Sequence, residues 1–230
     1  MKLSLNTYHW ELGCIILRHP QEGAAARAAK VSRVPIINAG DGRGEHPTQA
    51  LTDVGTIKRR FGAVDDLTVV ISGDLTGRTG RSLACTLAEF KSVKLVFASP
   101  PELRMKNDVL TYLETRNVAY TEHDRLSDVI HVGDVVYVTR PQRDKESGEI
   151  DYQEIRWDGQ NVDNAMMQCV KQDAIIMHPL PRNAELSPEV DDDPRVWCFR
   201  QTEYSVPMRM AVLELAMGKN PHAESLANAA

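Results

Sequence analysis

Short apolar runs that alternate with helix-like segments are the dominant feature of this sequence. Residues 67–72, 93–98 and 134–139 are rich in β-branched and other apolar side chains, and the apolar positions are continuous rather than alternating. Such runs are typical of strands that are covered on both faces, as in parallel sheets. Helical patterns lie before and between them, at residues 47–61 and 108–116. Because strands and helices alternate, the sequence predicts an α/β fold with largely parallel sheets.

Composition argues against several classes of protein. The chain has 230 residues and a net charge of −5 at pH 7, so a general nucleic-acid-binding surface is not expected. Its 4 cysteines form no Cys-x-x-Cys pair, which argues against a structural zinc site and against a disulfide framework. No apolar run reaches the length of a membrane span, and the first residues do not resemble a secretory signal. We therefore expect a cytoplasmic protein that needs no metal, nucleic acid or membrane.

A change in the pattern near residues 60–66 predicts a domain boundary, since a new series of strands and helices begins at Leu67. The total length leaves room for one large domain or two small ones. The sequence contains no internal repeat and no low-complexity segment. Residues 73–80 predict a turn, residues 126–131 a short helix, residues 161–170 a longer helix, and residues 201–217 a last one.

Residues 36–57 join a strand, a glycine-rich turn and a helix that opens on His46 and Pro47. The three glycines within residues 40–44 allow left-handed backbone angles and the close approach of a ligand. Proline suits the first helical turn, where its missing N–H costs nothing. His46 and Gln49 would then lie at a helix N-terminus, which favours an anion or a polarised oxygen. A helix with a solvent-facing histidine at its cap explains the same pattern.

Three arginines follow predicted strand ends: Arg18, Arg78 and Arg140. Loops at the carboxyl ends of parallel strands build the ligand site in such folds. Guanidinium groups bind phosphate and carboxylate through paired hydrogen bonds, so three of them predict a substrate with several negative charges. Any single arginine of this kind is more often a surface residue. The turn at residues 73–80 looks like a phosphate cradle, but it matches neither the dinucleotide-binding nor the P-loop spacing.

Several short motifs follow one another along the chain. They are Leu-Arg-His-Pro at 17–20, Asn-Ala-Gly-Asp-Gly at 38–42, His-Pro-Thr-Gln-Ala-Leu at 46–51, Gly-Asp-Leu at 73–75, Gly-Arg-Thr at 77–79, Tyr-Val-Thr-Arg at 137–140, His-Pro-Leu-Pro-Arg at 178–182 and Asp-Pro-Arg at 193–195. In this order they resemble the aspartate carbamoyltransferase branch of the aspartate/ornithine carbamoyltransferase family, from before Arg18 to about Asn220. The ornithine branch is disfavoured, because it typically carries Ser-Met-Gly where Arg140 stands and His-Cys-Leu-Pro at 178–181.

The resemblance implies a reaction. A carbamoyl group would pass from carbamoyl phosphate to the amino group of L-aspartate, in pyrimidine synthesis, with no cofactor. Arg18 would hold the phosphate and the carbonyl oxygen, His46 would hydrogen-bond that oxygen and polarise it, and Gln49 would hold the carbamoyl amine. Catalysis of this kind depends on positioning and on stabilisation of an oxyanion.

The resemblance also implies how the acceptor is held. Arg78 and Arg140 would bind the two carboxylates of aspartate, with Gln142 beside Arg140. The main-chain carbonyls of Pro179 and Leu180 would accept hydrogen bonds from the carbamoyl amine and the aspartate amine. The peptide bond after Leu180 would be cis.

For the architecture, the resemblance implies two doubly wound parallel-sheet subdomains, the first incomplete. Residues 1–62, completed by a helix at 201–220, would form a partial carbamoyl-phosphate-binding domain, and residues 63–200 the aspartate-binding domain. The family's Ser-Thr-Arg-Thr phosphate loop and its mobile loop with Ser and Lys do not appear before Arg18. We therefore expect a chain that lacks the N-terminal part of the first domain.

Two accounts of the whole protein remain open. The family implies a homotrimer or a larger assembly, with active sites between subunits. The alternative to an enzyme is a truncated, non-catalytic relative that keeps the pocket and serves as a binding or assembly partner.

Overall fold

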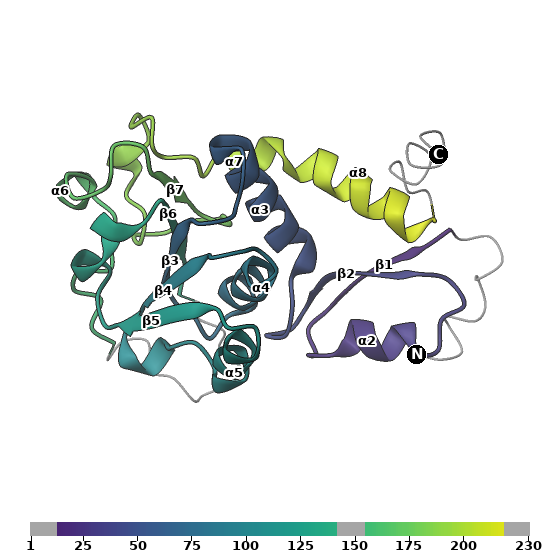
Figure 1. The fold of residues 1–230 in the computed structure, drawn as a ribbon. Coiled ribbons are helices and arrows are strands. Elements are labelled where there is room, and N and C mark those ends of the chain that lie inside the picture. Colours follow the sequence, from purple (N-terminus) through teal and green to yellow (C-terminus); the bar gives the residue numbers. More distant parts are fainter. Residues whose placement is uncertain (1–12, 142–154, 219–230) are drawn as a thin grey trace.

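The computed structural model describes residues 13–141 and 155–218, and its strands form two parallel sheets (Figure 1). The smaller sheet pairs β1 (Ile15–His19) with β2 (Ile36–Asp41). The larger sheet has the order β5-β4-β3-β6-β7, and all its pairings are parallel. Its strands are β3 (Thr68–Gly73), β4 (Lys94–Ala98), β5 (Ala119–His123), β6 (Val135–Thr139) and β7 (Ile175–Met177). The predicted α/β fold with parallel sheets is confirmed.

Helices cover both faces of the larger sheet. On one face lie α3 (Pro47–Phe61), α4 (Arg78–Leu87) and α5 (Asn107–Thr115), with the short η1 (Pro101–Leu103) nearby. On the other face lie η2 (Leu126–Asp128), η3 (Ile130–Val132), α6 (Asn164–Met167) and η4 (Pro188–Val190).

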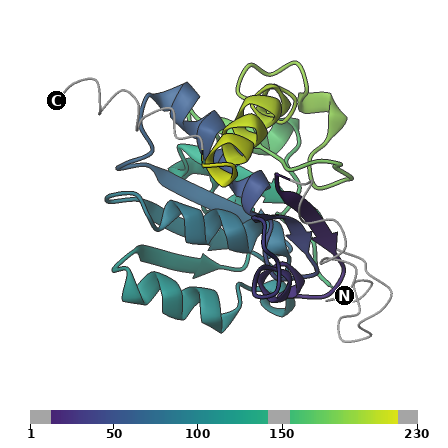
Figure 2. The same ribbon diagram turned by 90° about the vertical axis from the view of Figure 1, so that its right-hand side faces the viewer.

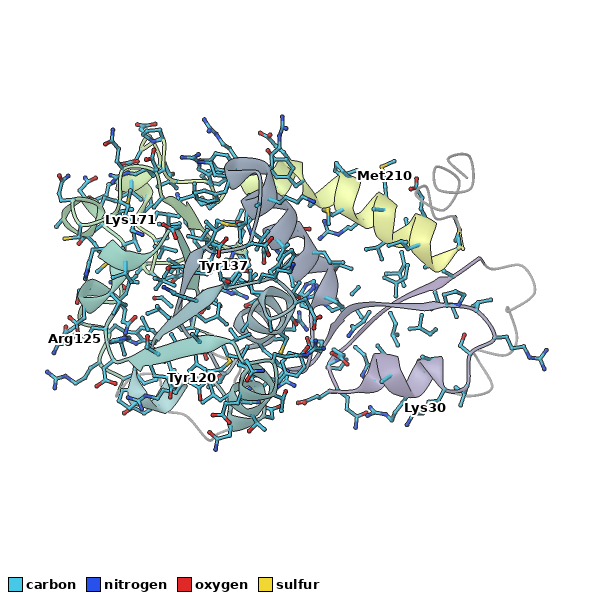
Figure 3. The ribbon with its side chains drawn as sticks, in the orientation of Figure 1. Lys30, Tyr120, Arg125, Tyr137, Lys171 and Met210 are labelled. Atoms are coloured by element: carbon cyan, nitrogen blue, oxygen red, sulfur yellow. The ribbon has the colours of Figure 1, made fainter. Side chains whose placement is uncertain are left out.

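Successive side chains of a strand point alternately toward one helical layer and the other. Val135 and Tyr137 of β6 pack among the residues of α3, α4 and α5, whereas Val136 and Val138 pack among those of η2, η3 and α6. Every residue of β6 is buried, which explains why the strand reads as a continuous apolar run. Tyr137 therefore points from the middle of the sheet toward α3, as Figure 3 shows.

The smaller sheet is enclosed by helices from different parts of the chain. Helix α2 (Ala24–Ala29) connects its two strands and packs on them, while α8 (Ser205–Ala216) crosses from the larger sheet and contacts β2 and α3 (Figures 1 and 2). None of the residues of α8 is buried. Val206, Met210 and Leu215 are more than half exposed, and Met210 lies on the side of α8 that faces away from β2 (Figure 3).

Three helix predictions were wrong in their bounds. Residues 126–131 form two short 3₁₀ helices instead of one helix. The helix predicted at 161–170 is reduced to α6, because Val162 pairs with Leu186 in a bridge and the Asp163 side chain caps the helix at Met166 N–H. The helix predicted at 201–217 is two, α7 (Arg200–Glu203) and α8. Pro207 has no N–H for the carbonyl four residues earlier and its ring clashes with that carbonyl, so α7 ends at Glu203.

Helix length and hydropathy also bear on membranes. Within the part of the chain that the structure describes, no helix has both the length and the apolar character needed to cross a bilayer.

Candidate active site

The start of α3 brings His46 against α4. His46 is the N-cap residue of α3, but its side chain makes no capping hydrogen bond. Its main-chain N–H donates instead to Ser82 Oγ of α4 at 2.8 Å, and the imidazole is half-buried. The alternative of a solvent-facing histidine at a helix cap is therefore wrong, and the imidazole lies where α3 and α4 begin side by side.

Three arginines act on the imidazole of His46. Burial, followed by the positive charges of Arg78, Arg18 and Arg209, lowers the pKa of His46 to about 4. At neutral pH the ring is thus uncharged and can donate an N–H without adding a further positive charge. Two of these arginines were predicted from the sequence. Arg209 of α8 was not given a role, although it lies in the segment that resembles the family.

Arg78 connects the two parts of the fold. It is the first residue of α4, so the prediction that residues 73–80 are all turn was wrong. Its Nη1 donates to the carbonyl of Gly42, which follows β2, at 3.1 Å. A Cβ on Gly40 would lie 3.0 Å from the guanidinium carbon, so a larger residue at position 40 would push Arg78 aside. The glycine-rich turn thus makes room for an arginine, where the sequence predicted room for a ligand.

The other two predicted arginines differ in position. Arg18 lies inside β1 rather than beyond its end, so that part of the prediction was wrong, and it is exposed. Arg140 directly follows β6, whose last residue, Thr139, pairs with Gly73 at the end of β3. It therefore lies at the same sheet edge as the loop that leads to Arg78. Gln142 lies outside the described residues.

Gln49 is held by a buried carboxylate. Its Nε2 donates at 2.8 Å to Oδ1 of Asp53, one turn later in α3. Asp53 also accepts hydrogen bonds from Gln201 of α7 and, at 2.7 Å, from the hydroxyl of Tyr137. Burial raises the pKa of Asp53 to about 7, although the three hydrogen bonds lower it. Asp53 and Gln201 were not predicted; the four-residue spacing from Gln49 is the signal that points to Asp53.

The segment after β7 contains both predicted main-chain acceptors, Pro179 and Leu180. The main-chain N–H of the buried His178 donates to Gln201 Oε1 at 3.2 Å. The N–H of Leu180 donates to His178 Nδ1 at 2.9 Å, so the ring proton is on Nε2, which lies 3.0 Å from Glu185 Oε1. The peptide bond after Leu180 is cis, as predicted. Gln49 and Leu180 are thus joined by one continuous set of hydrogen bonds.

A separate hollow lies beside α2 and β2. It has a volume of about 400 Å³ and is lined in part by Glu22, Asp41, Glu45 and Arg81. Asp41 accepts the main-chain N–H groups of Gly23 and Glu45 at 3.0 Å and 2.8 Å, and Arg81 pairs with Glu45 at 2.9 Å. These polar groups hold the turn before α3, and none of the described residues predicted for the site lines the hollow.

The lowered pKa of His46 predicts a loss of stability in acid. An unfolded histidine titrates near 6.5, so between pH 6.5 and 4 the unfolded state binds more protons, and the free energy of unfolding falls as the pH is lowered. Asp53 acts in the opposite sense, because its raised pKa makes the folded state bind more protons below pH 7. The contribution of His46 is therefore measured as the difference in the free energy of unfolding between the wild type and a variant at position 46, in which the contribution of Asp53 cancels.

We therefore expect the free energy of unfolding of the wild type, minus that of His46→Asn, to fall by about 1 kcal/mol from pH 7.5 to pH 5. This is less than the full linkage value, because the ring is partly exposed. Urea denaturation of both proteins at each pH measures it. A difference that does not change with pH would show that the folded protein does not hold His46 neutral.

Comparison with known proteins agrees with the motifs. The family model for the Asp/Orn binding domain of aspartate/ornithine carbamoyltransferase matches residues 65–216, and the model for its carbamoyl-P binding domain matches residues 5–59. A chloroplastic aspartate carbamoyltransferase of Arabidopsis thaliana is 46% identical over 204 residues, which are 88% of this chain and 52% of that protein. The aspartate carbamoyltransferase catalytic subunit of Methanocella arvoryzae is 44% identical over 206 residues, which are 89% of this chain and 66% of that protein. The chain spans about half the length of the plant relatives that it matches.

Solved structures show the same relationship. A crystal structure of aspartate transcarbamoylase from Trypanosoma cruzi with phosphate matches with a TM-score of 0.85 and 37% identity, over 93% of this chain and 71% of that chain. A second structure of that enzyme, with carbamoyl phosphate and aspartate, gives a TM-score of 0.85 and 39% identity, over 91% and 68%. By its motifs, its fold and these matches, the chain belongs to the aspartate/ornithine carbamoyltransferase family.

Proposed function

We propose that this chain transfers the carbamoyl group of carbamoyl phosphate to the amino group of L-aspartate, giving N-carbamoyl-L-aspartate and phosphate. The observation that carries the proposal is the neutral imidazole of His46 among three arginine charges. Such a site offers an uncharged N–H donor to a carbonyl oxygen and cationic groups to a phosphate and to carboxylates. Relatives named aspartate carbamoyltransferase, and a relative crystallised with carbamoyl phosphate and aspartate, support this choice of substrates.

In the proposed reaction, the amine of aspartate attacks the carbonyl carbon of carbamoyl phosphate. A C–N bond forms, negative charge develops on the carbonyl oxygen, and the bond from carbon to the phosphate oxygen then breaks. The amine loses one proton, and phosphate leaves with the bonding electron pair. His46 donates a hydrogen bond to the developing oxyanion. A donor that is already in place when the negative charge forms lowers the energy of the transition state.

The remaining residues hold the two substrates in line. Arg18 binds the phosphate and the carbonyl oxygen, and Gln49 binds the carbamoyl amine. Arg78 and Arg140, with Gln142, bind the two carboxylates of aspartate. The carbonyls of Pro179 and Leu180 accept from the two amines. The convergence of Arg18 and Arg78 on His46, and the place of Arg140 beside β3, support these roles.

We extend the proposal to the organisation of the protein. Residues 1–62, with the helix at 201–220, serve as the carbamoyl-phosphate-binding part, and residues 63–200 bind aspartate. The family models support a boundary near residue 62, since one ends at residue 59 and the other begins at residue 65, while the latter also extends over the last helix to residue 216. A cytoplasmic homotrimer, or a larger assembly with shared sites, completes the proposal. Analytical ultracentrifugation of the purified protein tests the trimer.

A radiolabelled transfer assay tests the function. The purified chain is given labelled carbamoyl phosphate with either L-aspartate or L-ornithine, and label is expected in the aspartate product only. Arg140→Gln is expected to raise the KM for aspartate by about tenfold or more, because a charge-assisted pair with a carboxylate is lost. Arg125→Gln, an exposed arginine at the start of η2, serves as the matched control and should leave the KM unchanged.

Two other outcomes would reject the proposal in different ways. Transfer of label to ornithine but not to aspartate would show that aspartate is not the acceptor. If no label is transferred, calorimetry with a bisubstrate phosphonate–aspartate analogue separates the remaining accounts. Binding of the analogue without transfer would favour a non-catalytic relative that serves as a binding or assembly partner.

A further inference from the structure

Two glutamine side chains donate to Oδ1 of Asp53, so this oxygen acts as an acceptor for both amides. Gln49 Nε2 lies 2.8 Å from Asp53 Oδ1, which turns the NH₂ half of the Gln49 amide inward. The side-chain oxygen of Gln49 therefore faces away from Asp53. An amide held in this way presents its oxygen, which can accept an N–H from a ligand.

The same oxygen of Asp53 fixes a second amide. Gln201 is 2% exposed and donates to Asp53 Oδ1, so its own oxygen is free to accept the N–H of His178 at 3.2 Å. His178 Nδ1 in turn accepts the N–H of Leu180 at 2.9 Å. Each link fixes the direction of the next one. Because the N–H of Leu180 is engaged by the ring, this segment offers a ligand its carbonyl oxygens.

Asp53 is well suited to hold both amides. It is fully buried between α3, β6 and α7, where its position is set by packing. Its other oxygen accepts the hydroxyl of Tyr137 at 2.7 Å, so both oxygens of Asp53 have partners. A buried acceptor that meets three donors from three elements is costly to replace by a group that donates.

We propose that Asp53 is a positioning residue that makes the site selective for the carbamoyl amine, by turning the Gln49 side-chain oxygen and the carbonyls at 179–180 toward it. The inference rests on the proposed function, which places the carbamoyl amine against these acceptors. Asp53 itself does not touch the substrate. It acts by fixing which half of the Gln49 amide, and which main-chain groups at 179–180, the substrate meets. A site of acceptors selects an NH₂ group over a methyl group of similar size.

Acetyl phosphate provides the test, because it carries a methyl group where carbamoyl phosphate carries NH₂. The quantity measured is the ratio of kcat/KM for carbamoyl phosphate to kcat/KM for acetyl phosphate, with aspartate as acceptor. In Asp53→Leu the side chain keeps a similar shape but has no acceptor, so both amides lose the oxygen that holds them and can flip. We expect the ratio to fall about tenfold or more. A purely structural defect would lower both values together and leave the ratio unchanged.

Two further variants make the test decisive. Tyr137→Phe disturbs the same buried network but leaves both amides on Oδ1, so the ratio should stay within about twofold of the wild type. Gln201→Met removes the hydrogen bonds of Gln201 to Asp53 and from His178 N–H but leaves Gln49 on Asp53, and the ratio should fall about threefold or more. If Asp53→Leu does not fold, the ratio measured for Gln201→Met decides whether the proposal holds.

The failure of this inference can be told from the failure of the proposed function. A wild-type chain that transfers no carbamoyl group to aspartate would overturn both. A wild type that transfers, together with variants at 53 and 201 that keep its ratio, would overturn only the role of Asp53.

Discussion

His46→Ala is expected to lower kcat for carbamoyl transfer by about a hundredfold. The substitution removes a hydrogen-bond donor that meets the carbonyl oxygen when it becomes negative, and the loss of one such donor typically costs a factor of 10²–10³. The imidazole is held ready for this task, since burial and three arginines keep it neutral. Steady-state kinetics with saturating carbamoyl phosphate and aspartate measure the change.

The controls for this prediction come from the same chain. His131→Ala, at an exposed position in η3, should leave kcat within about twofold of the wild type, as is usual for surface substitutions. His46→Asn retains an N–H donor on a shorter side chain and should lie between the wild type and the alanine variant. If His46→Ala retains at least a third of the wild-type kcat, the oxyanion is stabilised by other groups.

Gly73→Ala is expected to destabilise the fold by roughly 2–6 kcal/mol, the sum of backbone strain and overpacking. Gly73 has φ of +98°, and a Cβ there would lie 2.1 Å from the carbonyl oxygen of Thr139. That oxygen belongs to the neighbouring strand, and Thr139 Oγ1 also donates to Ser72 O at 2.8 Å and to Asp74 O at 3.1 Å. The strand ends cannot separate without losing these buried hydrogen bonds.

Gly62→Ala is the matched control. Gly62 also has a positive φ, of +83°, but nothing lies within 4 Å of the Cβ that the substitution would add. We expect only the cost of the left-handed backbone, about 1–2 kcal/mol. Urea denaturation of both variants therefore separates the clash from the strain. Equal losses of stability would mean that the ends of β3 and β6 can move apart freely, and that Arg140 beyond them is not firmly placed.

The sequence predicted those parts of the molecule whose structure depends on local pattern. Strands β3, β4 and β6 of the larger sheet were predicted because they are largely buried, and a continuous apolar run is typical of a strand covered on both faces. Helix α3 was predicted from Pro47 to its end before Gly62, because proline and glycine mark helix ends in the chain itself. The cis bond after Leu180 was predicted from the family motif and is confirmed.

What the sequence could not predict depends on contacts between distant residues. Asp53 lies among apolar residues of α3, and only the arrival of Tyr137 and Gln201 from β6 and α7 gives its carboxylate partners. From the local sequence pattern alone, an aspartate at this position is interpreted as an interruption of the apolar face of α3. The role of Gly40 was misread for the same reason, since its close neighbour is the side chain of Arg78, 38 positions away in the sequence.

The crossing of α8 onto β2 has a consequence for how the molecule is made. Ribosomes release a chain from its N-terminus, so all five strands of the larger sheet emerge before α8 does. Until then α2 packs on β1 and β2 and α3 contacts β2, but the contact between α8 and β2 is missing. The smaller sheet is therefore completed after the strands of the larger sheet have emerged, and a nascent chain that stalls before residue 205 would leave β2 without its contact with α8.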